Sequence, residues 1–371
     1  MVALTIATGA LAQTSGLKLE NLNRDVNPGD DFYEFACGGW MKNNPLKPEY
    51  ASFGSFNTLE ELNNERIRDI IETMAGQKNE KGSVAQKVGD LYTLYMDSVR
   101  QNKEGVKPVM ADIERIGAVK TKKQYMSLIN QMNREGVSFG ELWEYYLGAD
   151  MMSSTENLLD ISQGGYTIDR DYYVEQDEAH KNILDAYCHH VKKMFMLIGL
   201  NESEAEAKMR NVVALETRMA KAGKPNVELR DPGSNYNKMS FADFVKEYDG
   251  FDWKKYFDTI GLTNIDYLSV GQPNALAEAM KVIKEEKLEV LKDAMQWSVL
   301  NSAANILGDE VYAEHFDFNY RVMSGTQQPK PRWKRSVNAV NGVLGEAVGQ
   351  LYVQKYFPAV NKERMEKLVR N

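Results

Sequence analysis

The chain has 371 residues, of which 43% are hydrophobic, and it carries a formal net charge of −8 at pH 7. The length allows about two to three domains, and the apolar fraction is enough for a sizeable core. The negative charge and the lack of an extended basic face argue against nucleic acid as the main partner. The two cysteines, Cys37 and Cys188, are too few for a disulfide scaffold.

The first twelve residues are uncharged and end in Ala10-Leu11-Ala12. They resemble the apolar region and the cleavage site of a secretory signal peptide, which would make Gln13 the first mature residue. Residues 1–12 are too few to span a bilayer. We therefore expect this segment to be a signal-peptide remnant, and the protein to be exported to the periplasm, the cell envelope or the exterior.

A first helical turn is predicted directly after the turn-forming pair Pro28-Gly29. Asp30 and Asp31 can both accept backbone N–H groups at a helix start. Gly38-Gly39 predict a sharp reversal of the chain ahead of Trp40, because glycine adopts conformations that other residues avoid.

Further helices are predicted where apolar residues repeat at helical spacing. Capping boxes are expected at Thr58 with Glu61 and at Ser203 with Glu206. The other predicted helices begin near Ser83, Lys107, Thr121, Asp177, Ser240, Asp252 and Pro273, or cover residues 288–307, 309–318, 333–356 and 362–371. The periodicity weakens between Val137 and Gly165, where residues 142–147 and 157–162 are predicted as two short strands. The fold class is therefore mainly α, a multi-helix lobe with at most a short β-hairpin.

The sequence lacks the residue patterns of common catalytic and metal sites. The His-Glu-x-x-His motif of zinc peptidases is missing, and no two of the four histidines, His180, His189, His190 and His315, are three or four residues apart. His189 and His190 are adjacent, so on a helix their side chains would point roughly 100° apart. We assign no catalytic residue and no metal ligand, and the substrate-binding residues are not assigned.

Two other groups of residues have structural interpretations. The basic cluster Lys330, Arg332, Lys334 and Arg335 is predicted to be a solvated loop that enters a helix. Cys188 lies on an apolar helix face, where a buried free thiol is expected. In an oxidising compartment, a bond between Cys37 and Cys188 is the alternative.

Several short motifs, in a fixed order, resemble the neprilysin and endothelin-converting-enzyme family of zinc metallopeptidases. They are Asn23-Arg24-Asp25, Pro28-Gly29-Asp30-Asp31-Phe32-Tyr33, Cys37-Gly38-Gly39-Trp40, Phe53-Gly54-Ser55-Phe56, Asp169-Arg170-Asp171-Tyr172-Tyr173, Leu215-Glu216-Thr217, Arg230-Asp231-Pro232, Pro331-Arg332-Trp333-Lys334-Arg335 and the run from Leu344 to Val353. The motifs are weak singly, but their order along residues 23–357 makes the resemblance specific.

The resemblance implies that the catalytic machinery lies outside this stretch. In the family, the zinc ligands and the catalytic glutamate belong to a C-terminal lobe, and the N-terminal region forms a mostly helical lobe that restricts substrates to peptides. We expect residues 13–56 to pack on the missing catalytic lobe, and residues 57–371 to form the substrate-gating lobe. Zinc is expected for the complete enzyme and not in this chain, and the expected partners are peptide substrates and the catalytic lobe.

Two details of the resemblance affect specificity and covalent structure. In the family, the cysteine at the position of Cys37 commonly bonds to the distant C-terminal part. Some members contact the carboxylate of the substrate with two arginines, where this chain has Ser52 and Glu60. That form of anchoring is therefore not expected here. The alternative function is a stand-alone exported helical module that binds peptides or a protein without catalysis.

Overall fold

The computed structural model describes residues 18–137 and 139–370. The predicted signal-peptide remnant lies outside these residues. The N-terminal half contains η1 Leu19–Asn21, α1 Phe32–Asn43, α2 Ser55–Ala75, α3 Val84–Met96, α4 Ser98–Glu104, α5 Lys107–Gly117, α6 Lys122–Glu135, β1 Trp143–Asp150, β2 Ser153–Gln163 and α7 Arg170–Val174. The rest contains α8 Glu178–Leu197, α9 Glu202–Ala222, α10 Asn226–Leu229, β3 Lys238–Ser240, α11 Phe241–Glu247, α12 Trp253–Thr259, β4 Tyr267–Val270, α13 Pro273–Glu285, α14 Leu288–Ala303, η2 Ala304–Ile306, α15 Asp309–Phe316, the π-helix η3 Asp317–Val322, α16 Arg332–Tyr356 and α17 Ala359–Arg370.

The mainly helical class is confirmed, and the two predicted strands form the hairpin β1–β2. The sheet is larger than a hairpin, with strand order β1-β2-β4-β3. β4 pairs in parallel with β2, placing Leu159 opposite Leu268 and Ile161 opposite Val270. Pairing of this kind joins segments about a hundred residues apart, so short-range periodicity could not predict it.

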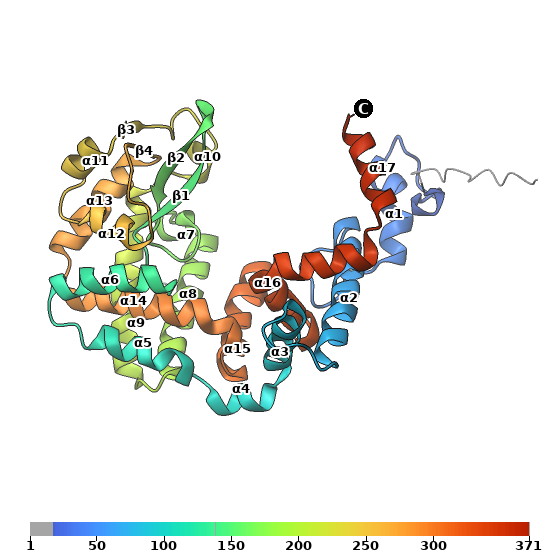
Figure 1. Cartoon of the computed structure of the whole chain (residues 1–371), viewed down its shortest axis with the longest axis horizontal. Helices are drawn as coiled ribbons and strands as arrows, with labels where there is room; N and C mark the ends of the chain where they lie inside the picture. The colour runs from blue at the N-terminus through green and yellow to red at the C-terminus, as the bar shows by residue number, and fades with distance from the viewer. Residues whose placement is uncertain (1–17, 138, 371) are drawn as a thin grey trace, which may run out of the picture.

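The larger of two hydrophobic cores is built from α5 to α15 and the sheet. It contains an aromatic cluster in which the ring centroids of Trp143 and Trp253 lie 4.6 Å apart. Phe251, Tyr256 and Phe257 complete the cluster. Figure 1 shows this body, with the sheet at its upper edge, on one side of the molecule.

A smaller core joins helices from the two ends of the chain. Ile71 of α2, Val88 and Tyr92 of α3, and Val337, Val340 and Val348 of α16 are buried together. Figure 1 shows these helices, with α1 and α17, as a second body, and α4 and α15 between the two bodies. The boundary expected between residues 56 and 57 falls inside α2, which begins at Ser55.

Gly89 allows α3 to lie directly against the C-terminal end of α2. A Cβ atom on Gly89 would lie 2.9 Å from backbone atoms of Ala75. We expect Gly89→Ala to lower the free energy of unfolding by about 1–2 kcal/mol, because overpacking forces the two helices apart. Gly342→Ala on α16 is the control, since an added Cβ there meets nothing within 4 Å. Urea denaturation measures both, and equal stability of the two variants would contradict the close approach.

The predicted helix starts are mostly confirmed. Asp31, Ser83, Thr121, Asp177, Ser240 and Asp252 each accept a backbone N–H group at a helix N-terminus. Both predicted capping boxes are wrong. The Asn57 side chain bonds to the Gly54 N–H at the start of α2, and Asn201 and Glu204 form the reciprocal pair at the start of α9. Each helix begins a few residues earlier than predicted, because another polar side chain satisfies its first N–H groups.

The predicted reversal at Gly38-Gly39 is also wrong, because both residues lie inside α1. A Cβ on Gly39 would meet the backbone oxygen of Glu20 at 2.4 Å, and one on Gly38 would meet the Glu34 side chain. The glycines therefore let the segment around η1 cross α1 closely. Among the described residues, no helix is long and apolar enough to span a bilayer.

Candidate functional site

The Cys37–Trp40 motif lines a hollow between α1 and the start of α2. The cavity has a volume of about 600 Å³. Its lining includes Tyr33, Cys37, Trp40, Met41, Phe53 and Leu59. Tyr33 and Leu59 are 67% and 55% exposed, so the apolar lining continues onto the surface.

Aromatic contacts fix the floor of this hollow. The rings of Trp40 and Phe53 are stacked with centroids 6.1 Å apart, and Tyr50 meets Phe53 edge-on at 5.2 Å. The ammonium group of Lys47 lies 5.3 Å from the centre of the Phe53 ring. Trp40 is therefore held in place by packing within this chain, with part of the hollow left open.

Exposed apolar side chains are concentrated around the same body. Phe56 of α2 is 85% exposed and Val369 of α17 is 81% exposed. Others on α1, α2 and α17 are Phe32, Leu62, Val360, Met365 and Leu368. Apolar surface of this kind is typical of a region that contacts another polypeptide.

The histidines are dispersed or structural. His190 is 2% exposed, bonds to Glu314 at 3.0 Å and stacks on Phe318. Burial, aided by the charge of His190, lowers the pKa of His315 to about 4. His180 bonds to Asp177 at the start of α8, and His189 bonds to the backbone oxygen of Asp185.

A zinc site is not formed by this set of side chains. In residues 18–137 and 139–370, no group of three or more His, Cys, Asp and Glu side chains is placed to hold a metal ion. The buried Glu314 is already shared between His190 and Lys193. The described residues therefore do not fit the metal centre of a zinc peptidase.

Both cysteines are free thiols, and each is half-buried. Cys188, on α8, was predicted to be a free thiol on an apolar face. Burial raises its pKa to about 11, so its thiol stays protonated at neutral pH. Cys37 lies in the hollow beside Trp40.

The basic cluster lies where the chain enters α16, as predicted, but it is not solvated, and that part of the prediction is wrong. Lys334 is 7% exposed and donates to Glu49 and Glu61 at 2.9 and 3.0 Å. Lys330 bonds to Glu60, the residue at one of the two family arginine positions, while Ser52, at the other, is exposed. The acidic partners lie far away in the sequence, so the pairing had no local signal.

Comparison with known proteins places this architecture in a group of peptidases. Residues 28–371 match the family model described as "Peptidase family M13". Neprilysin-3 of Drosophila melanogaster is 26% identical over 371 residues, which are 95% of this chain and 47% of that protein. The chain thus spans about half the length of the curated relatives it matches.

Solved structures agree with the sequence match. The inhibitor complex of the Mycobacterium tuberculosis zinc metalloprotease Zmp1 is similar with a TM-score of 0.88 and 30% identity, over 96% of this chain and 54% of that chain. The open state of the same metalloprotease gives a TM-score of 0.79, over 93% of this chain and 53% of that chain.

Proposed function

This chain belongs to peptidase family M13, and we propose that it is the N-terminal helical lobe of a zinc metalloendopeptidase that cleaves peptides. The lobe restricts access to an active site that is formed by further polypeptide. The observation that carries the proposal is the similarity along 96% of this chain to an inhibitor-bound zinc metalloprotease of which it covers 54%.

The surface of the second body, which surrounds the smaller core, is the proposed contact with the catalytic lobe. This body has a hollow around Cys37 and Trp40, and α1, α2 and α17 expose apolar residues. Both features favour an interface with another part of the protein. The proposed contact therefore includes more than residues 13–56, because α2, α3 and α16 share one core with each other. Zinc is held by the catalytic lobe in this proposal.

The larger body is the proposed gate. A lobe that closes over a metal centre excludes folded proteins and admits flexible peptides. Two separate cores allow the bodies to move as units, since each keeps its own packing during the movement. The TM-score is 0.88 with the inhibitor complex and 0.79 with the open state of the same metalloprotease, and this difference is compatible with a lobe that changes shape. The same proposal places the protein outside the cytoplasm, where peptides are the substrates.

Peptide cleavage tests the proposal. We expect the complete protein with zinc to cleave a short fluorogenic peptide, and to leave the same peptide sequence intact when it is embedded in a folded protein. This chain alone, with and without zinc, should cleave neither substrate. The measurement is the rate of cleavage of the two substrates under identical conditions.

The outcomes separate the alternatives. Equal cleavage of the free and the embedded sequence would contradict gating. Zinc-dependent cleavage by this chain alone would contradict the proposal that the active site is formed by further polypeptide. Tight peptide binding by this chain, with no cleavage by the complete protein, would support a binding module instead.

A further inference from the structure

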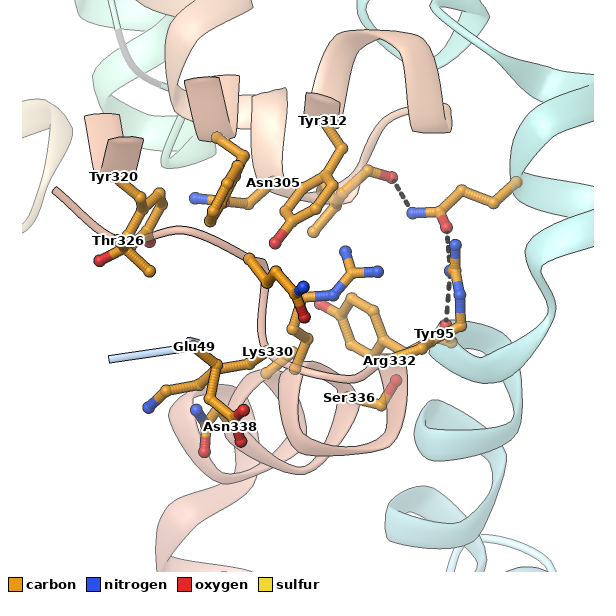
Figure 2. A pocket seen from close by; sticks show the side chains of 16 residues that line it. Glu49, Tyr95, Asn305, Tyr312, Tyr320, Thr326, Lys330, Arg332, Ser336 and Asn338 are labelled. Atoms are coloured by element: carbon orange, nitrogen blue, oxygen red, sulfur yellow. Dashed lines mark hydrogen bonds between the residues drawn. The ribbon is translucent and has the colours of Figure 1, made fainter. Parts of the chain in front are cut away.

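A second cavity lies at the junction of the two bodies, away from the hollow at Trp40. Its volume is about 420 Å³, within the range of roughly 300–1,000 Å³ that is usual for small-molecule sites. α3 and α16 of the smaller core contribute Tyr95 and Ser336, and α15 and η3 contribute Tyr312 and Tyr320. Figure 2 shows Tyr312 and Tyr320 on one side of the cavity, and Ser336 and Asn338 on the other.

Among the residues that the structure describes, Arg335 is the cation of this cavity that forms no ion pair. Arg332 is paired with Asp309 at 2.6 Å and Lys330 with Glu60 at 2.9 Å. No ion pair to Arg335 is present in the described parts of the chain, and its buried Nε atom has no hydrogen-bond partner there. Burial, together with the neighbouring charge of Arg332, lowers the pKa of Arg335, although Tyr312 and Asp309 act in the opposite direction.

One part of the cavity wall is aromatic, although polar residues and the Glu49 carboxylate also line the cavity. The Arg335 guanidinium lies 3.9 Å from the centre of the Tyr312 ring, which fixes its plane by a cation–π contact. Tyr95, Phe316 and Tyr320 add aromatic surface. Tyr320 belongs to the π-helix η3, an irregularity that is frequent at functional sites.

We propose that this cavity binds a small carboxylate with an aromatic or aliphatic body, with the carboxylate on Arg335 and the body between the tyrosines. A guanidinium is well suited to a carboxylate, because it can donate two parallel hydrogen bonds. A ligand in this position touches elements of both cores. It therefore stabilises one arrangement of the two bodies, which makes the cavity a regulatory site.

Calorimetric titration of the chain with 3-phenylpropionate tests the proposal. We expect this carboxylate to bind at least about tenfold more tightly than 3-phenylpropionamide, because charged hydrogen bonds contribute roughly 1.5–3 kcal/mol. Arg335→Gln should reduce the affinity for the carboxylate to that for the amide. Arg210→Gln is the matched control and should leave the affinity unchanged, since Arg210 lies on the exposed face of α9.

Several results would overturn the proposal. Equal binding of carboxylate and amide, or unchanged binding by Arg335→Gln, would show that Arg335 does not bind the carboxylate. If inorganic phosphate bound more tightly than 3-phenylpropionate, the apolar body of the ligand would not contribute to binding. If Arg335→Gln does not fold, Ala339→Phe fills the cavity while keeping the cation, and undiminished binding by that variant would place the ligand elsewhere. Binding is measured without any cleavage, so these results are independent of the peptidase proposal.

Discussion

Lys334→Met is expected to lower the free energy of unfolding by about 2–3 kcal/mol. Lys334 connects α16 to Glu49 and to Glu61 of α2 through two hydrogen bonds. Burial lowers its pKa, but the bonds to the two glutamates outweigh burial and the pKa is raised overall. The charged form is therefore the stable one in the folded protein.

The size of the loss follows from what the substitution leaves behind. Glu49 loses this ion pair, while Glu61 keeps its bond from Lys47 at 2.5 Å. Removing one partner of a buried ion pair costs about 3–5 kcal/mol, and we expect less because the Glu49 and Glu61 side chains remain 18% and 19% exposed to water.

Urea denaturation followed by circular dichroism measures this loss. Lys367→Met is the control, because Lys367 is 71% exposed and pairs with Glu363 one helical turn away. Exposed pairs of this kind contribute under about 1 kcal/mol. If the two cores unfold in separate transitions, the loss should appear in the one that contains α2, α3 and α16. Equal, small losses in both variants would show that the Lys334 pair is unimportant.

Glu216→Gln is expected to remove a pH dependence of stability in the larger core. Glu216 is 5% exposed and has no cation partner in residues 18–137 and 139–370. It accepts hydrogen bonds from Thr167 at 2.6 Å, Tyr173 at 2.9 Å and Tyr187 at 2.8 Å. Burial raises the pKa of Glu216 from 4.5 to about 7, although these three hydroxyl groups act in the opposite direction.

The sign of the effect follows from the raised pKa. The folded state holds the Glu216 proton more tightly than the unfolded state. The stabilisation is therefore complete below pH about 4.5, and it is lost as the pH rises to about 7. The difference corresponds to roughly 3 kcal/mol at about 1.4 kcal/mol per pKa unit. Glutamine is neutral throughout, so the variant lacks this dependence.

The comparison is made between pH 5 and pH 8. We expect the free energy of unfolding of Glu216→Gln, relative to the original chain, to rise by roughly 3 kcal/mol over this interval. At pH 5 the variant should be slightly less stable, since its amide has to fit among three hydroxyl donors. Glu363→Gln, at an exposed site on α17, is the control and should run parallel to the original chain. If the stability of Glu216→Gln ran parallel to that of the original chain, the Glu216 carboxyl group of the original chain would titrate near its ordinary pKa.

The sequence by itself determined the helices and the family. Apolar spacing and capping residues such as Asp31 and Thr121 are local signals, because a helix satisfies its backbone groups within a few residues. The ordered motifs from Asn23 to Val353 carried the resemblance, which the match over residues 28–371 confirmed.

Only the tertiary structure decided which side chains meet across the chain. Lys334 looked like one of four solvated cations, but Glu49 and Glu61 bury it from about 280 residues away. Arg335, its neighbour, stacks on Tyr312 and forms no ion pair with any residue that the structure describes. The parallel pairing of β2 with β4 also joins residues that are far apart in the sequence. Burial and ion pairing depend on long-range packing, and the local pattern of residues does not contain it.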